Sequence, residues 1–400
     1  MWNYLAGVDY FVGDAGTYWK ALNAAMQAHA QQSTQAAALA RRLTASARTK
    51  LDAIRAIRDY IAQNIRAAGP GFTNLPLNEL SAADTTLADG YGHAADRAIL
   101  FSAMLSAAGF SPEFVIASTL PPVPGIKNVA DSFPLPEDFQ TPLVRVKVAG
   151  QDYYLNDGDQ YAHLGATASD DKLGLVLSSG KLETIQAAPG CGNKTETDLV
   201  LSLTADGKAH IKIAKYYYGQ QYGQTNRYFA ELPPEERKQY FQEAVSGVAQ
   251  GARAASDLKT DFSTYPGVEE FSVDLDDYGV ATGNYLYFNL PFTPSQFATA
   301  TDRRALPMYM PGKSERIVRA EVDLPAGYRE TDVAPKSGHF AAPGGSQTRI
   351  TKTSAAGKCT ITYDFTTRPA VISPADYPKL VNIQSALGQK SGTTFLLERE

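Results

Sequence analysis

The first seventy residues show the hydrophobic spacing of buried helices. In the clearest segment, hydrophobic residues recur every three or four positions with charged residues between them: Leu51, Ile54, Ile57, Ile61 and Ile65. This spacing places the hydrophobic side chains on one face of a helix. Residues 24–43 are rich in Ala and Gln, which also favour a helix. Gly69-Pro70 is expected to end the helical region, because proline cannot continue a helix.

Residues 94–108 form a second strong helical segment, which is hydrophobic nearly all round. A helix without a polar face is expected in the middle of a domain. The residues that follow predict a strand at 112–118, a proline-rich loop at 120–140, a strand at 143–148 and a return strand at 153–155. Helices followed by antiparallel strands indicate an α+β domain.

A change in composition at residues 187–193, with several turn-forming residues, indicates a domain boundary. The first domain then spans residues 1–188 and the second spans residues 189–400. In the second domain, alternating hydrophobic residues predict strands at 199–203 and 211–213, on either side of a tight turn.

Strands are expected to dominate the rest of this second domain. The pattern predicts a strand at 270–275 paired with one at 285–290, and further strands at 317–324 and 359–366. One helix is expected to open at Pro233-Pro234-Glu235-Glu236, because proline and acidic residues both suit a first helical turn. We therefore expect a β-sandwich-rich domain with an inserted helix.

The composition excludes several classes of protein. Hydrophobic residues make up 44% of the 400-residue chain, which is typical of a chain with a folded core. The formal net charge is −5 and no cluster of basic residues stands out, so no nucleic acid is expected as a partner. No hydrophobic run approaches the ~20 residues that span a bilayer, so no transmembrane segment is expected.

The two cysteines, Cys191 and Cys359, lack the spacing of a metal site, and nothing in the sequence predicts a metal or a cofactor. Both fall in the strand-rich part of the chain, so they are candidates for a disulfide. Such a disulfide would imply an oxidising compartment. As an alternative, Cys191 is a candidate for a displaced catalytic nucleophile, which the disulfide would exclude.

The segment Gly90-Tyr91-Gly92-His93-Ala94 offers a place for catalysis, because a glycine-rich turn leads into the start of the second strong helix. The positive end of a helix lowers the pKa of a thiol, and its backbone amides stabilise an oxyanion. A following strand can then supply a histidine as the base, and the next strand an acid that orients it.

This layout resembles the transglutaminase-like superfamily, which is related to papain-like cysteine proteases. It is most similar to large bacterial envelope proteins in which such a domain lies between two domains of unknown function. Their motif reads roughly Gly-Tyr-Gly-Asp-Cys-Lys-Asp-Lys-Ala, followed later by Phe-Asn-His and by Trp-Leu-Asp-Pro-Thr. In this chain the thiol position falls on Ala94, the base position on Thr141 and the acid position on Asn156.

The resemblance implies a bacterial protein of the periplasm or the extracellular space. The amino terminus, Met1-Trp2-Asn3-Tyr4, lacks the basic stretch and hydrophobic core of a signal peptide. Its abrupt start leads us to expect a piece cut from a longer parent. The sequence predicts no oligomeric state.

Loss of all three catalytic groups predicts a pseudoenzyme, since a methyl group cannot attack a carbonyl and threonine cannot replace an imidazole near neutral pH. We expect a binding or scaffolding module for a peptide or another cell-envelope polymer. Its cleft would be lined by Tyr91, His93, Ala94, Asp96, Thr141 and Asn156. One alternative is an active hydrolase or acyltransferase that uses His93 and Asp96, although both also suit a purely structural role at the helix start. Another is a rigid spacer with no ligand.

Overall fold

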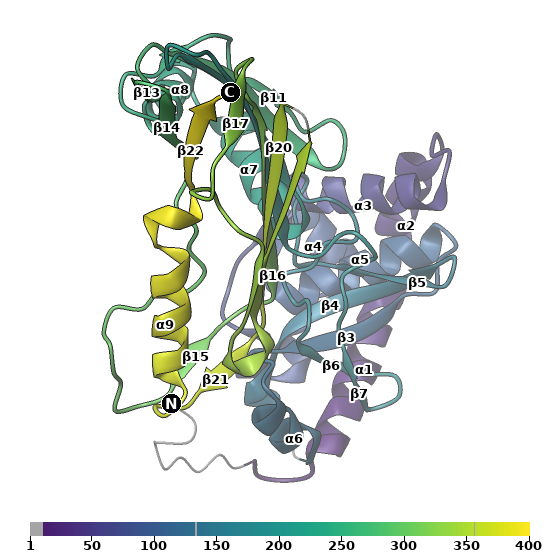
Figure 1. The fold of residues 1–400 in the computed structure, drawn as a ribbon. Helices are drawn as coiled ribbons and strands as arrows, with labels where there is room; N and C mark the ends of the chain where they lie inside the picture. The colour runs from purple at the N-terminus through teal and green to yellow at the C-terminus, as the bar shows by residue number, and fades with distance from the viewer. Residues whose placement is uncertain (1–10, 133, 356) are drawn as a thin grey trace. The chain divides into compact units, whose positions relative to one another are not determined.

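The computed structural model describes residues 11–132, 134–355 and 357–400. The chain divides into two compact units, one ending at Gly192 and the other beginning at Asn193. The first unit combines helices with one antiparallel sheet, and the second unit is rich in strands (Figure 1). The expected α+β class is therefore confirmed. The division lies four residues beyond the boundary after residue 188 that the composition suggested.

The helices of the first unit surround one central helix. They are α1 (Ala15–Gln31), α2 (Thr34–Thr44), α3 (Lys50–Asn64), α4 (Ala83–Asp89), α5 (Ala94–Ala107) and α6 (Pro124–Ser132), with short 3-10 turns at Phe72–Asn74, Leu77–Glu79 and Pro136–Asp138. The predicted helix at 51–65 is α3, and Ile54, Ile57 and Ile61 on its inner face are fully buried. The predicted central helix is α5, which contacts α1, α2, α3 and α4.

Helix α3 ends at Asn64, before the Gly69-Pro70 pair that was expected to stop it. The next residues form strand β1 (Arg66–Ala67), which pairs in parallel with β2 (Tyr91–Gly92). This pairing holds the turn before α5 against the end of α3. A long-range strand pair therefore ends the helix earlier than its own local sequence would.

The first unit has one five-stranded antiparallel sheet. Its strands are β3 (Glu113–Ser118), β4 (Phe139–Val148), β5 (Gln151–Leu155), β6 (Leu173–Val176) and β7 (Lys181–Thr184), in the order β5-β4-β3-β6-β7. One face carries Ile116 and Val144, which share a core with α5. The other face carries Ala117 and Leu143, which belong to a smaller hydrophobic cluster.

The loop expected at residues 120–140 contains helix α6, so this prediction was wrong. Its prolines read as loop residues, but Pro124 occupies the first position of the helix, where a missing backbone N–H costs nothing. Ala130 anchors α6 because it is fully buried in the core that α5 shares with the sheet.

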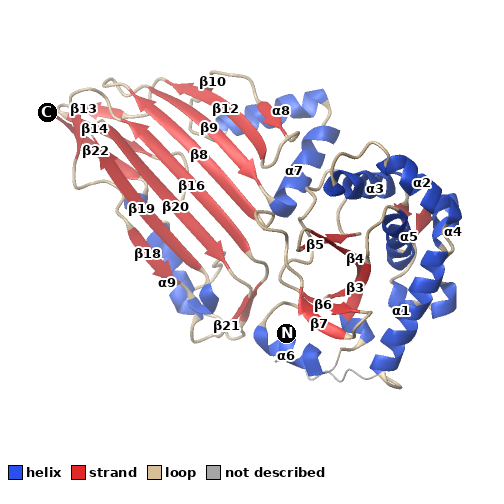
Figure 2. Cartoon of the chain, turned by 90° about the vertical axis from the view of Figure 1, so that its right-hand side faces the viewer, coloured by secondary structure: helices blue, strands red, loops and turns tan. Residues whose placement is uncertain are grey.

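The second unit contains two larger sheets (Figure 2). The nine-stranded sheet consists of β8 (Lys194–Leu203), β9 (Ala209–Tyr217), β10 (Arg253–Ala254), β11 (Lys259–Asp261), β12 (Gly267–Leu275), β16 (Ser314–Asp323), β18 (Gly338–Ala341), β19 (Gln347–Ala355) and β20 (Lys358–Thr367). The four-stranded sheet consists of β13 (Val280–Thr282), β14 (Tyr285–Asn289), β17 (Tyr328–Glu330) and β22 (Thr394–Arg399). A two-stranded sheet joins β15 (Met308–Met310) to β21 (Ala370–Ile372).

The two larger sheets share one hydrophobic core. Phe288 of β14 stacks on Phe395 of β22, with 4.9 Å between the ring centroids. Both rings belong to the same buried cluster as Ile211 and Val273 of the nine-stranded sheet. The sheets therefore cover each other face to face, which agrees with the sandwich-rich domain that the sequence predicts.

Two details of the second unit differ from the prediction. The strands at 270–275 and 285–290 do not pair, because β12 pairs with β9, β10 and β11 while β14 pairs with β13 and β22. The chain crosses from one sheet to the other between them. In place of one inserted helix, the unit has α7 (Gly219–Glu231), α8 (Pro234–Ser246) and α9 (Tyr377–Leu387), with 3-10 turns at Pro343–Gly345 and Lys390–Gly392.

Candidate functional site

The segments that carry Ala94, Thr141 and Asn156 lie at one end of the five-stranded sheet. The antiparallel register places the ends of β3, β5 and β7 beside the beginnings of β4 and β6. Asn156 directly follows β5, and Ala94 begins α5. The three positions predicted from the catalytic motif therefore belong to segments that meet at this end.

The side chain of Asn156 links the segments that meet at this end of the sheet. Its side-chain Nδ2 donates hydrogen bonds to the carbonyl oxygens of Ala94 and Pro142, each at 2.8 Å. The residue has a φ of 88°, a left-handed conformation that asparagine tolerates better than most residues. One amide group thus connects the start of α5, the start of β4 and the end of β5.

Ala94 lies at the leading end of α5 and is exposed, whereas Ala95 and Asp96 behind it are buried. The position is open to solvent and is not filled by a neighbouring side chain. It has the setting in which a thiol would be activated, at the positive end of a helix, but it carries only a methyl group.

The side chain of Thr141 lies on the wrong face of the sheet for a catalytic base, which would have to face Ala94. Thr141 pairs with Ala117, and side chains alternate along a strand, so Thr141 shares the sheet face of Ala117 and Leu143. Helix α5 packs on the opposite face, on which Val144 lies. No hydrogen bond joins the Thr141 side chain to Ala94 or Asn156 in the described structure. The structure therefore brings Ala94 and Asn156 together, with the Pro142 backbone between them, and directs Thr141 away.

His93 and Asp96 form the cap that starts α5. His93 Nδ1 accepts the backbone N–H groups of Ala95, at 3.1 Å, and Asp96, at 3.3 Å. The Asp96 carboxylate accepts the backbone N–H of His93, at 3.2 Å, and that of Ser81, at 2.8 Å. This reciprocal arrangement is a capping box, which satisfies N–H groups that a helix end leaves free.

The capping role leaves His93 poorly placed as a base. Burial lowers the pKa of His93, and the nearby Asp96 carboxylate opposes that shift only in part. The imidazole is therefore neutral at pH 7, and because Nδ1 accepts hydrogen bonds the proton is assigned to Nε2. Nε2 lies 3.3 Å from Asp96 Oδ1, in a geometry that does not make a hydrogen bond.

Replacing His93 tests this assignment. His93→Ala is expected to lower the free energy of unfolding by about 1 kcal/mol, whereas His93→Asn should come close to wild type because asparagine is a good cap. Since the pKa of His93 is lowered in the folded state, its contribution to stability decreases as the pH falls below the unfolded value of ~6.5. His93→Asn should therefore lose less stability than wild type between pH 7 and pH 5 in urea titrations. Equal slopes would contradict a buried, neutral His93.

Two further side chains lie near the start of α5. Tyr91 is 56% exposed, so its ring is available to a ligand. Arg97 lies three positions after Ala94, on the same side of the helix, and burial lowers its pKa. Its Nε is buried without a hydrogen-bond partner in the described part of the chain. Packing therefore desolvates part of the Arg97 guanidinium, which the sequence alone does not reveal.

The disulfide prediction was wrong, since neither cysteine forms one. Cys359 is fully buried in the core of the second unit, where burial raises the pKa of its thiol to about 12. Cys191 belongs to the first unit and is 6% exposed. The two cysteines are therefore buried in different units, which their shared strand-rich sequence context did not indicate.

Cys191 has one feature of a catalytic thiol, because its Sγ lies 3.5 Å from His163 Nδ1. However, burial and the charges of Arg55 and Arg58 lower the pKa of His163 to about 4. A neutral imidazole does not stabilise a thiolate as an imidazolium would. With so low a pKa, His163 is a poor acceptor for the thiol proton, so this pair does not form the thiolate–imidazolium pair of a cysteine protease.

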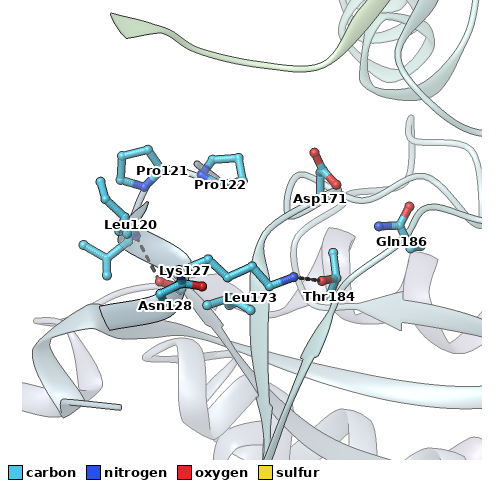
Figure 3. A pocket seen from close by; sticks show the side chains of 11 residues that line it. Leu120, Pro121, Pro122, Lys127, Asn128, Asp171, Leu173, Thr184 and Gln186 are labelled. Carbon is cyan, nitrogen blue, oxygen red and sulfur yellow. Dashed lines mark hydrogen bonds between the residues drawn. The ribbon is translucent and has the colours of Figure 1, made fainter. Parts of the chain in front are cut away.

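A pocket of about 390 Å³ opens at the same end of the sheet, beyond β3 (Figure 3). The sequence did not predict this pocket, because its walls come largely from the segment expected to be a loop at 120–140 and from residues 171–186, for which no element was predicted. In the described parts of the chain, no three His, Cys, Asp or Glu side chains are grouped as a metal site would require. The described helices also include none with the length and hydrophobicity to cross a membrane.

Comparisons with known proteins agree with this geometry. Residues 37–134 match the family model of the transglutaminase-like superfamily, and residues 284–397 match a domain of unknown function, DUF3858. A crystal structure of a putative protease from Parabacteroides distasonis is similar in fold, with a TM-score of 0.50 and 15% sequence identity. The match covers 95% of this chain and 58% of that one. The curated proteins include no match.

The chain therefore carries a domain of the transglutaminase-like superfamily, as the motif at the start of α5 predicted. The family match includes Ala94 but ends before Thr141 and Asn156. The placement of these last two positions rests on the resemblance in sequence, and the structure brings Asn156, but not the Thr141 side chain, to Ala94.

Proposed function

We propose that this protein is a non-catalytic binding or scaffolding module of the bacterial envelope, and that its degenerate site holds an extended peptide or another envelope polymer. The observation that carries the proposal is the double hydrogen bond from Asn156 to the carbonyl oxygens of Ala94 and Pro142. These two hydrogen bonds keep the start of α5, the start of β4 and the end of β5 together, as in a catalytic site, although Ala94 has no nucleophile.

The chemistry of the site supports binding without turnover. A neutral amide stands where an acid would orient the base, and both of its N–H groups are directed at backbone carbonyls. Thr141 offers neither an imidazole nor the right direction. Hydrolysis by His93 and Asp96 gains no support, because both side chains are used to cap α5.

The location in the periplasm or outside the cell is part of this proposal. It rests on the resemblance to envelope proteins and agrees with the bacterial source of the structure that is similar in fold. This chain spans 58% of the length of that protein. Partners that bind through other parts of a longer protein fall outside the proposal.

The proposal predicts binding that depends on the open position at Ala94. The probes are soluble bacterial cell-wall fragments and an array of capped hexapeptides, tested by fluorescence anisotropy and, for turnover, by mass spectrometry. Wild type should bind a probe and leave it unchanged. Ala94→Trp should fill the exposed position and weaken binding about tenfold or more, which is the size of effect typical of blocking a contact at the centre of a site.

Ser106→Trp is the matched control, since Ser106 is exposed in the last turn of the same helix. It should bind like wild type. Cleavage or transfer of any amide or ester by wild type, lost in Ala94→Trp, would show an enzyme. Equal binding by wild type and Ala94→Trp would remove the site from the function.

A further inference from the structure

The pocket beyond β3 combines a hydrophobic floor with a few polar groups. Leu120, Pro121, Ile126 and Leu173 supply hydrophobic surface, and Figure 3 shows Lys127 extending across the floor toward Thr184. Its volume of about 390 Å³ falls within the range of sites that enclose small ligands or peptide side chains.

Two charged side chains line the pocket, Lys127 and Asp171, and Lys127 is the one that an acidic ligand would meet. Its Nζ donates a hydrogen bond to Thr184 Oγ1 at 2.6 Å, and this partner is neutral. The side chain is half-buried, yet no carboxylate of the described chain lies within ion-pair distance of it. A partly desolvated ammonium with unused donors favours a carboxylate, which forms a charge-assisted hydrogen bond.

Strand β7 places beside this lysine backbone groups that have no hydrogen-bond partner among the described residues. It is the last strand of its sheet within the described residues. Ile185 directs both backbone groups toward the neighbouring strand, since its N–H bonds to Lys172 and its carbonyl accepts from Asp171, each at 2.8 Å. Because backbone groups alternate in direction along a strand, those of Thr184 and Gln186 point away from the sheet. Both of these residues also line the pocket.

Thr184 links the two features. Its backbone lies on the open edge, and its hydroxyl holds the Lys127 ammonium. A residue opposite Thr184 on an added strand would have its Cβ about 5 Å from that of Thr184. A carboxylate on that residue would reach the Lys127 Nζ, and its aliphatic carbons would lie over the hydrophobic floor.

We propose that β7 and this pocket form a peptide-binding site, in which an extended peptide adds a strand to the edge of β7 and places an acidic side chain on Lys127. Backbone hydrogen bonds supply affinity in this mode of recognition, and the pocket supplies specificity. The site does not include Ala94 or Asn156, so it stands whether or not the degenerate site binds a ligand.

The test uses the full chain and an array of capped heptapeptides in which every residue type occupies the central position, between alternating valine and threonine. Wild type should favour peptides with central Glu or Asp about tenfold over Gln or Asn, as expected for a partly buried charged hydrogen bond. Lys127→Met should remove this preference while retaining weaker binding of the uncharged peptides.

Thr184→Pro should abolish binding of all the peptides, because it removes the outward N–H of the edge. The variant should still fold, because proline is tolerated where the N–H of an edge strand faces outward, and a thermal melt checks this. If it does not fold, peptides with an N-methylated central backbone test the same hydrogen bonds against wild type. Lys181→Met is the matched control, since Lys181 lies on β7 but outside the pocket, and it should keep the acidic preference.

Three results would overturn the site: no binding of any peptide to wild type, no preference for an acidic centre, or the same preference in Lys127→Met. Ala94→Trp distinguishes this site from the proposed function. It should bind the acidic peptides like wild type, and a loss of their binding in Ala94→Trp alone would assign them to the Ala94 site instead.

Discussion

A protein carrying Ala94→Cys is expected to gain one fast-reacting thiol and still to hydrolyse no peptide. The new side chain would stand at the exposed leading end of α5, where the positive end of the helix dipole lowers the pKa of a thiol. The two native cysteines are expected to react slowly, so they add little to the measured alkylation. Cys359 is fully buried with its pKa raised to about 12, and Cys191 is nearly inaccessible.

The absence of hydrolysis follows from the rest of the site. The strand register directs the side chain of Thr141 to the sheet face opposite α5, and His93 is engaged in capping. A thiolate without an imidazole to protonate the leaving amine does not complete amide cleavage. The variant should therefore be alkylated by iodoacetamide but remain inactive in amide and ester assays.

Ser106→Cys is the appropriate control for reactivity, because Ser106 is also exposed but lies at the negative end of the same helix. Its alkylation should be about tenfold slower than that of Ala94→Cys, since the two helix ends differ by roughly 1–2 kcal/mol in their interaction with an anion. Equal rates would show that the start of α5 does not activate a thiol. Steady amide hydrolysis by Ala94→Cys would show that a working base is present after all.

Asn156→Asp should destabilise the protein, although it restores the acid that the family motif has at this position. An ionised carboxylate cannot donate to the carbonyl oxygens of Ala94 and Pro142, which lie 2.8 Å from the present amide nitrogen. The negative carboxylate oxygens would instead face the two carbonyl oxygens, which carry a partial negative charge and repel them. We expect a loss of about 1–3 kcal/mol in the free energy of unfolding at pH 7, because the half-buried site loses two hydrogen bonds and leaves two carbonyl oxygens without their donors.

The pH dependence of this variant follows from the same contacts. The two carbonyl oxygens favour the protonated acid, so the pKa of the new carboxyl should be raised in the folded state. The loss of stability should then be complete above that raised pKa and should shrink as the pH falls toward the unfolded value of ~3.9. Urea unfolding at several pH values, monitored by circular dichroism, measures this recovery relative to wild type.

Asn156→Gly separates the charge from the lost hydrogen bonds. It removes the same two donors, and glycine adopts the positive φ of this position without strain. Its stability relative to wild type should not change with pH in the acidic range as that of Asn156→Asp does. If Asn156→Asp were as stable as wild type at pH 7, the site could accept the catalytic acid and its asparagine would not be needed to hold the fold.

The sequence predicted the elements whose signal is local. Helices α3 and α5 follow from the spacing of buried residues over several turns, and the hairpin of β4 and β5 follows from alternation around a turn. Helix α6 was missed because the prolines at its start and on either side of it mask its short pattern. The partners of β12 and β14 were missed because pairing depends on residues far away in the chain. Local patterns carry no information about which distant strand completes a sheet.

The sequence by itself determined the class of the protein, because the glycine-rich turn and the hydrophobic helix after it are contiguous and specific. At the positions where the resemblance places the thiol, the imidazole and the acid, the sequence has Ala94, Thr141 and Asn156. Only the tertiary structure decided what the remaining residues do. The bond between Asn156 and Ala94 joins residues 62 positions apart, and the direction of Thr141 depends on its register with β3. Such contacts form only when the strands pair, so the geometry of the site is a property of the folded chain.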